Sequence, residues 1–298
     1  MERRYALGAG LVIIGGVFLS LSGIMLRNIE SANGWQILFY RGLAFSLMLF
    51  LILLLKYRKG TLSAFRAIGR PGLWAALALG LGSVAYIFAI LLTSVANALF
   101  IIGASPLATA LVGWLILGEK TSRFGITAML ISLTGIGLMF ADGLIEGRWL
   151  GNIAALIVVA SFVIFLLLVR GRRQVDMLPA TCLGGLVMAA VGGIFADDLV
   201  ISNHDLVISL LMGWVQFGIG FLCFTIATRY IMASEVALFA LTESILGPIW
   251  VWYGVGEQPS LLTFIGSGIV LLCVSSYCIA GIREERRRLQ SISTRSPT

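Results

Sequence analysis

The sequence predicts an all-α integral membrane protein with ten transmembrane helices. The chain of 298 residues is 59% hydrophobic and only 12% charged, and its mean hydropathy is +1.01. Soluble domains carry about 25% charged residues, so this chain has too few polar groups to cover the surface of a soluble protein. Glycine contributes 35 residues, and small residues let membrane helices pack closely. Ten spans of about 20 residues each fit within the length.

Apolar runs between charged or turn-forming breaks delimit the ten predicted helices. The first five are expected at 5–26, 35–55, 72–92, 96–117 and 124–140. The second five are expected at 150–169, 178–196, 206–228, 231–255 and 261–280. The first run follows basic residues, as in a signal peptide, but its apolar stretch of about 22 residues is longer than a signal peptide's and no A-x-A site follows. We therefore expect it to be a retained helix.

Charged residues between the predicted helices set the orientation. With the N-terminus in the cytoplasm, eighteen of the 21 Lys and Arg residues lie on the cytoplasmic side. Only Arg27 and Arg148 lie in outer loops, and Arg41 lies within a helix. Because Lys and Arg in short loops resist translocation, this asymmetry predicts that both termini are cytoplasmic. The net charge of +7 is then explained by topology, and no nucleic acid partner is expected.

Two segments of the chain match at an offset of 138 residues. NALFIIGASPLATALVGWLILGEK from Asn97 aligns with EVALFALTESILGPIWVWYGVGEQ from Glu235, which pairs Glu119 with Glu257. The segments fall in the fourth helix of each five-helix half. Since five is odd, the halves enter the membrane from opposite sides, and inverted repeats are typical of secondary transporters with a midplane site. Chance similarity between two apolar helices is the alternative.

The same stretches resemble a known family. PLATALVGWLILGE from Pro106 and SILGPIWVWYGVGE ending at Glu257, each followed by a glycine-containing helix, are similar to the drug/metabolite transporter superfamily in its EamA-type ten-helix branch. Arg41 in the second helix also fits that pattern. Ser244 departs from it, because this residue matches Pro106 while the proline comes four residues later as Pro248. The kink in the ninth helix is therefore expected about one turn further along. Within the superfamily, the chain resembles exporters of amino acids, including aromatic ones.

The resemblance implies two inverted five-helix repeats around a central cavity, which helices one, three, four, six, eight and nine surround. Helices five and ten would be peripheral. The chain divides accordingly into a first repeat at 1–141, a second at 149–282 and a basic cytoplasmic tail at 283–298. The resemblance also implies export of small metabolites across a bacterial inner membrane. The expected partners are a small-molecule substrate, taken to be an amino acid, and the lipid bilayer, and the oligomeric state stays open.

Glu243 is the strongest single indication of a transport site, because it lies near the middle of an apolar run of about 25 residues. A carboxylate there costs at least a few kcal/mol unless a partner, a proton or a bound cation offsets it. Glu243 is therefore predicted to bind a substrate ammonium or to carry protons. The alternative is a structural role at a helix interface, either as an ion pair, for which Arg41 is one candidate partner, or as a hydrogen-bonded carboxyl. Arg41 itself is expected to be a structural charge. Pro106 and Pro248 free backbone carbonyls that can line a site or form pivots, unless they are simple kinks.

Polar and aromatic side chains recur on the helices that would surround the cavity. Trp214, Phe217 and Phe221 stand at i, i+3 and i+7 in the eighth helix and are expected to share one face, with Gln216 to one side. The other substrate-binding candidates pair polar with aromatic residues on three further helices: Ser83, Tyr86, Asn97, Phe100, Ser161 and Phe165. Such a mixture suits a pocket for an amphipathic solute of amino-acid size. Packing or lipid contact is the alternative for each aromatic residue.

The sequence contains no pattern for a nucleotide, a cofactor or a metal. It has no GxxxxGK[ST] motif, one histidine, His204, and four cysteines without ligand spacing. We therefore expect no cofactor, no metal, no nucleotide and no catalytic residue. The predicted function is a secondary transporter that exports amino acids and related metabolites by alternating access, through facilitated diffusion. Proton-coupled efflux of drugs or other metabolites is the alternative, and a structural or receptor-like membrane protein is the alternative outside the transporter class.

Overall fold

Helices account for every regular element of the residues that the structure describes, which are 2–117, 123–170, 172, 175–227 and 233–293. In the first half, the computed structural model has α1 (Glu2–Ser20), α2 (Ser22–Arg27), α3 (Gly34–Tyr57), the 3-10 turn η1 (Arg58–Gly60), α4 (Thr61–Ala67), α5 (Gly69–Leu92), α6 (Val95–Gly103), α7 (Ser105–Leu117) and α8 (Arg123–Ile145). The second half has α9 (Trp149–Arg170), α10 (Leu178–Phe195), α11 (Asn203–Leu211), the π-helix η2 (Met212–Ile219), α12 (Gly220–Ala227), α13 (Ala233–Val255) and α14 (Leu261–Ser293).

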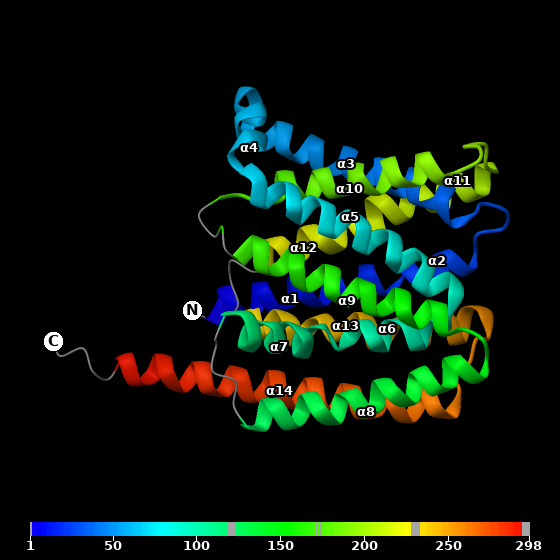
Figure 1. Ribbon diagram of the computed structural model, residues 1–298. Helices are drawn as coiled ribbons and strands as arrows, with labels where there is room; N and C mark the ends of the chain where they lie inside the picture. Colours follow the sequence, from blue (N-terminus) through cyan, green and yellow to red (C-terminus); the bar gives the residue numbers. More distant parts are fainter. Residues whose placement is uncertain (1, 118–122, 171, 173–174, 228–232, 294–298) are drawn as a thin grey trace.

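The helices run side by side and roughly parallel or antiparallel to one another (Figure 1). The start of α1 and the end of α14 lie at the same end of the bundle as α4, on the left in Figure 1. Among the described residues, seven helical segments are long and apolar enough to cross a membrane, and two shorter apolar helices, Val95–Thr109 and Leu261–Tyr277, accompany them. The predicted helical membrane class is confirmed. The number of ten crossings and the inverted repeat stay predictions.

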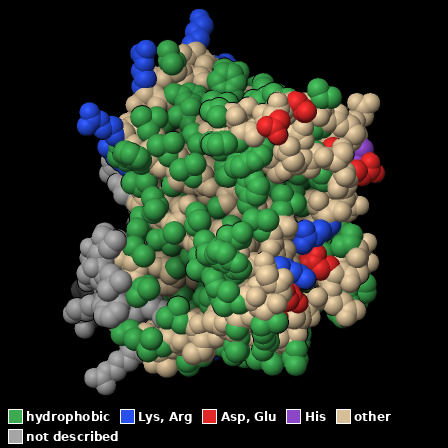
Figure 2. All heavy atoms as spheres, turned by 45° about the vertical axis from the view of Figure 1, so that its right-hand side comes forward, with side chains coloured by type: hydrophobic (Ala, Val, Ile, Leu, Met, Phe, Trp, Pro, Cys, Tyr) green, Lys and Arg blue, Asp and Glu red, His purple; other side chains and the backbone are tan. Residues whose placement is uncertain are grey.

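The surface has the distribution of side chains that a bilayer requires. Figure 2 shows hydrophobic side chains over the middle of the visible face, Lys and Arg side chains at the upper left, and acidic side chains together with further Lys or Arg side chains towards the right. Large apolar residues such as Leu55, Phe264 and Leu272 are more than two thirds exposed. A protein in water would bury more of them, whereas lipid tails are a favourable environment for them.

The predicted helix at 96–117 is broken in two at Ala104. The cause is local, because Pro106 has no N–H to donate to the carbonyl of Ile102. Ser105 Oγ donates to that carbonyl instead, at 2.5 Å. The break therefore divides one predicted span into α6 and α7 without leaving the carbonyl unpaired.

Two other predicted helices also contain irregular backbone. The helix predicted at 5–26 is interrupted at Leu21, between α1 and α2. The helix predicted at 206–228 consists of α11, η2 and α12, and its middle part, Met212–Ile219, is π-helical. Apolar runs do not reveal such features, because hydropathy carries no information about which carbonyl each N–H meets.

The last helix is longer than predicted. The sequence indicated a helix at 261–280 and a basic tail at 283–298, whereas α14 continues to Ser293. The rest of the predicted tail, 294–298, lies outside the described residues. The basic segment up to Ser293 is therefore helical and continuous with the last helix, and its assignment as a cytoplasmic tail stays a prediction.

The helices pack in a pattern that relates the two halves. α3 packs against α10, α6 against α13 and α8 against α14. The large α5–α9 interface has its counterpart in the contacts of α1 with α12 and η2. α8 and α14 form one edge of the bundle, at the bottom of Figure 1, while α1, α5, α6, α9 and α13 lie further inside.

Glycines bring the two edge helices into backbone contact. A Cβ atom on Gly135 of α8 would lie 2.7 Å from the carbonyl oxygen of Gly266. A Cβ atom on Gly266 of α14 would lie 2.6 Å from the carbonyl oxygen of Gly135. Neither position has room for a side chain, so α8 and α14 approach as closely as membrane helices with small interface residues do.

Candidate functional site

Polar side chains from three helices meet in the interior of the bundle. Tyr86 of α5 donates a hydrogen bond from Oη to Glu243 Oε1 of α13, at 3.2 Å. The same hydroxyl shares a short hydrogen bond with Ser22 Oγ at the start of α2. The ion pairs between described residues do not include Glu243 with Arg41. The bond from Tyr86 agrees with the alternative of a hydrogen-bonded carboxyl at a helix interface, and the transport role of Glu243 stays a prediction. The carboxyl of Glu243 is held by a hydroxyl.

Arg41 of α3 lies beside this group and is 1% exposed. Its Nη2 donates to Gln216 Oε1 at 3.4 Å, and Gln216 Nε2 donates to the carbonyl of Leu19 at 3.0 Å. The guanidinium carbon lies 4.4 Å from the ring centroid of Phe217 and 5.6 Å from that of Tyr86. Such cation–π contacts stabilise a desolvated guanidinium. We call Ser22, Arg41, Tyr86, Gln216 and Glu243 the central cluster.

Irregular backbone positions two members of the central cluster. Ser22 is the first residue of α2, directly after the interruption at Leu21. Gln216 belongs to the π-helix η2. Discontinuous and π-helical segments occur frequently at functional sites of membrane proteins, because they turn polar groups towards a site that a regular helix would leave apolar.

The predicted aromatic group is only partly assembled. Phe217 and Phe221 are in contact, with ring centroids 4.5 Å apart, and Phe45 of α3 lies 4.6 Å from Phe217. Trp214 is 47% exposed and contributes no ring contact within the described part of the chain. Trp214 therefore does not join the ring contacts of Phe217 and Phe221. These residues begin in a π-helix, which closes on i→i+5 hydrogen bonds and so changes the angular spacing of side chains, and a common face for all three stays a prediction.

Asn97 of α6, a predicted substrate ligand, takes part in a buried hydrogen-bond network instead. Its Nδ2 donates to Asn152 Oδ1 of α9 at 2.7 Å and lies 3.4 Å from the carbonyl of Met139 on α8. Asn152 Nδ2 donates to the same carbonyl at 3.1 Å. These bonds join three helices, and Asn152 was not among the predicted residues. Its partner stands 55 residues away in the sequence, so no local pattern could indicate the pair.

The remaining predicted candidates lie in packed surroundings. Ser83 Oγ donates to a carbonyl of its own helix at 2.8 Å. Ser161 packs against Gly82, where an added Cβ atom would lie 2.8 Å from the Ser161 Cβ. Phe100 belongs to the hydrophobic core, and Phe165 packs on the margin of the core. The structure does not bring these four residues into the central cluster.

The two prolines differ in their effect on the backbone. Pro106 follows the break between α6 and α7, whereas α13 continues as a helix through Pro248. One turn before Pro248, Ser244 Oγ donates to the carbonyl of Leu99 at 3.0 Å. This bond joins α13 to α6 next to Glu243.

A second polar arrangement joins the two halves at the end of the bundle opposite α4 (Figure 1). Arg27 Nε, at the end of α2, donates to Glu257 Oε2 at 2.7 Å. Glu257 Oε1 accepts from the backbone N–H of Val95 at 2.8 Å, and Arg27 Nη2 donates to the carbonyl of Thr93 at 3.0 Å. We call this the Arg27–Glu257 clasp. The sequence indicated Glu257 only as part of a repeat.

Ser22 is the member of the central cluster that the sequence did not indicate. A serine within an apolar run has no spacing signature. The SLSG segment at 20–23, with two serines and a glycine inside a predicted span, is the feature that could have pointed to the interruption of the first helix.

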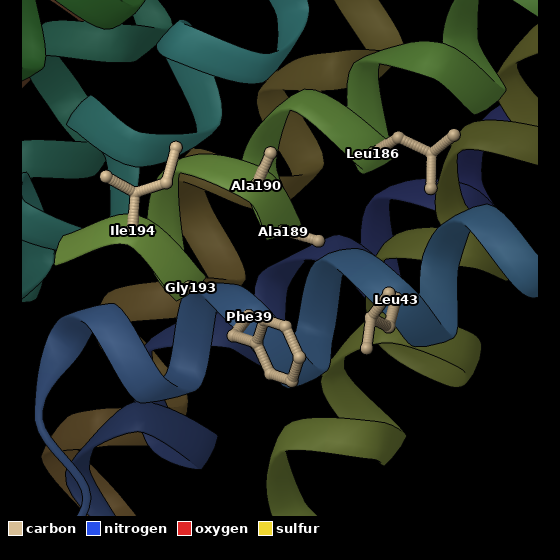
Figure 3. A pocket seen from close by; sticks show the side chains of 7 residues that line it. All are labelled: Phe39, Leu43, Leu186, Ala189, Ala190, Gly193 and Ile194. Atoms are coloured by element: carbon tan, nitrogen blue, oxygen red, sulfur yellow. The ribbon is translucent and has the colours of Figure 1, made fainter. Parts of the chain in front are cut away.

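An apolar groove of about 400 Å³ lies on the surface of α3 and α10. Figure 3 shows its lining, which comes only from these two helices: Phe39, Leu43, Leu186, Ala189, Ala190, Gly193 and Ile194. None of these side chains can form a hydrogen bond, so the groove has nothing to orient a polar solute. The described residues contain no group of three His, Cys, Asp or Glu side chains arranged for a metal ion.

Comparison with known proteins gives a family and a fold. The model of the EamA-like transporter family matches residues 6–141 and 147–277. One solved structure that resembles the chain, described only as "Crystal structure of protein", superposes with a TM-score of 0.62 over 92% of this chain and 97% of that chain, at 15% sequence identity. This likeness concerns the fold alone. No match was found among the curated proteins.

Proposed function

Since the chain belongs to the EamA-like transporter family, and so is a multi-pass membrane transporter of small solutes, we propose that it exports amino acids by alternating access. The central cluster is the observation that carries this proposal. It holds a cation and a carboxylate close together in the interior of an apolar bundle, where charges are costly and occur mostly at functional sites.

Glu243 is the proposed ligand for the substrate ammonium. Glu243 and Tyr86 both keep some accessible surface, although each lies within a long apolar helix, whereas Arg41 and Gln216 are buried. A solute can therefore reach the carboxylate end of the central cluster first. Tyr86 holds one carboxylate oxygen, which leaves the second oxygen to accept from an ammonium group.

The packing of the halves supports alternating access. The helices that the sequence places at equal positions in the two repeats pack against each other, namely α3 with α10, α6 with α13 and α8 with α14. Such pairs are expected when an axis in the membrane plane relates two inverted repeats. Exchange of conformation between the halves would then open the central cluster to one side and close it to the other.

The orientation proposed here places both termini in the cytoplasm of a bacterium, with the transporter in the inner membrane. The Arg27–Glu257 clasp is then on the outer side. It joins α2 and the α5–α6 connection of the first half to the end of α13 in the second half. The clasp must separate whenever the central cluster opens outwards.

Facilitated diffusion is the proposed energetic mode, and proton-coupled efflux is the second candidate. The observation that favours coupling is that Glu243, an interior carboxyl, has a hydroxyl partner and no cation partner among the described residues. Such a carboxyl can exchange a proton with solution when its side of the protein is open.

Flux into proteoliposomes tests both modes. The purified protein is reconstituted, and uptake of a panel of radiolabelled amino acids is measured with and without a pH gradient, for wild type and Glu243→Gln. Loss of the ammonium ligand should lower the affinity about tenfold or more, since a charge-assisted hydrogen bond contributes roughly 1.5–3 kcal/mol. If Glu243→Gln keeps the affinity of wild type and loses only the dependence of uptake on the pH gradient, proton coupling is favoured. Uptake equal to that of empty vesicles for every solute would refute the transport of amino acids.

A further inference from the structure

Arg41 is a buried cation whose hydrogen-bonding capacity is largely unused. A guanidinium has five N–H donors, yet among the described residues the acceptor for Arg41 is Gln216 Oε1, at the long distance of 3.4 Å. Nε and Nη1 have no acceptor in the part of the chain that the structure describes. Because the side chain is 1% exposed, solvent at the protein surface does not replace one.

Other arginines of this chain show how a structural arginine is satisfied. Arg27 donates Nε to the carboxylate of Glu257 at 2.7 Å. Arg148 pairs through Nε with Glu146 at 3.2 Å. Both have a carboxylate and both are more exposed than Arg41. Arg41 is the most deeply buried of the three and has no carboxylate partner among the described residues.

Two aromatic rings contact Arg41 without accepting hydrogen bonds from its guanidinium edge. The Phe217 ring lies 4.4 Å and the Tyr86 ring 5.6 Å from the guanidinium carbon, measured to the ring centroids. Ring contacts stabilise the cation without using its N–H groups. Those groups point outwards in the guanidinium plane, where a carboxylate accepts them with good geometry.

We propose that Arg41 binds the carboxylate of the transported solute, so that the substrate is a zwitterion with its ammonium group on Glu243. This inference rests on the proposed function and specifies the substrate class of the same site. It gives Arg41 a role in binding in place of the structural charge that the sequence suggested.

The charges of the central cluster favour a zwitterion over other anions. Tyr86 contacts both charged residues, because its ring lies under Arg41 and its hydroxyl donates to Glu243. A simple anion would satisfy Arg41 and leave the carboxylate of Glu243 without a cation. A simple amine would satisfy Glu243 and leave the guanidinium of Arg41 without an anion. An α-amino acid carries both complementary charges on one carbon atom and has no net charge to desolvate.

The test compares solutes that differ only in the carboxylate. Full-length protein in proteoliposomes is assayed with leucine and phenylalanine, with their carboxamides, and with the decarboxylated amines. Wild type should take up each amino acid with a kcat/KM at least tenfold above that of its carboxamide, the ratio expected for a lost charge-assisted hydrogen bond. In Arg41→Gln the ratio should fall below about twofold, and Arg41→Lys should restore part of it.

Three controls separate the outcomes. Arg148→Gln removes an arginine outside the central cluster and should leave the ratio unchanged. Thermal unfolding in detergent shows whether Arg41→Gln folds. If it does not fold, a competition assay on the wild-type protein replaces the variant. In that assay, the carboxamides should inhibit amino acid uptake at least tenfold more weakly than the unlabelled amino acids do.

Equal transport or equal inhibition by acid and carboxamide in wild type would overturn the role of Arg41 while leaving amino acid transport intact. An Arg41→Gln protein that folds and keeps the full ratio would overturn it as well. Absence of uptake of any probe by wild type would instead refute the proposed function, and the inference with it.

Discussion

In the proposed orientation, removal of one charge from the Arg27–Glu257 clasp should open the outer side of the protein. Glu257→Gln keeps an oxygen that can accept from the N–H of Val95, but it removes the charge that Arg27 meets at 2.7 Å. Arg27→Gln instead removes the cation and leaves the carboxylate of Glu257. Both variants should therefore weaken the closed outer side without adding bulk.

The magnitude follows from the geometry. A hydrogen bond to a charged group contributes about 1.5–3 kcal/mol and a neutral one about 0.5–1.5 kcal/mol. The two side chains are 24% and 23% exposed, so solvent screens part of that difference. A net loss of about 1 kcal/mol for the closed outer side is expected, which shifts its equilibrium with the open outer side about fivefold.

Cysteine labelling from the outside measures this shift. Ser22, which is buried, is replaced by cysteine in a variant whose four native cysteines are changed to serine. A membrane-impermeant thiol reagent should label Ser22→Cys about fivefold faster in either clasp variant. Because both variants break the same contact, the double variant should label about as fast as each single one.

A second ion pair serves as the matched control. Arg148 and Glu146 pair at 3.2 Å within one turn, so this pair does not join the halves. Glu146→Gln should leave the labelling rate unchanged. Unchanged labelling in both clasp variants, or fully additive effects in the double variant, would refute the reasoning that the clasp holds the outer side closed.

Three further predictions concern topology and stability. Glu146→Cys and His204→Cys, at exposed positions, should both label from outside intact cells, and labelling only after permeabilisation would reverse the orientation. Asn152→Ala leaves the buried Asn97 without its nearest partner and should lower the free energy of unfolding by about 1–3 kcal/mol, read from thermal unfolding, with no change in substrate preference. Burial raises the pKa of Asp176, but hydrogen bonds from a lysine and a tyrosine of α3 outweigh it and lower that pKa below its usual value. Its stabilising effect should thus be present above the usual pKa of an Asp, near 3.9, and be lost as pH falls through the lowered value, a pH dependence that Asp176→Asn should weaken.

Hydropathy located most helix ends but none of the irregular backbone. The spans predicted to end at Leu92 and Val255 do so, because the apolar run and the helix stop at the same residue. The interruptions at Leu21 and Ala104 escaped prediction, since a run of apolar residues looks the same whether or not its hydrogen bonds are continuous. Pro106 was the one sequence feature that indicated an irregularity close to the break at Ala104.

Members of the central cluster could be predicted only where a single polar residue contrasts with the apolar residues around it in the sequence. Glu243 stands out in an apolar run, and Tyr86 and Gln216 stand out as polar groups on predicted interior helices. Ser22 has no such contrast. Asn97 looked equally suitable, but its partners come from helices that a single sequence does not place beside it.

The glycine contact between α8 and α14 has a consequence for measuring motion. At Gly135 and Gly266 the backbones of the two helices are in contact and neighbouring side chains pack closely around them, so a sliding motion of one helix past the other would meet steric clashes. Spin labels or fluorophores on this pair should keep one fixed separation throughout the transport cycle. The pair can therefore serve as a fixed reference for measuring how far the other helices move.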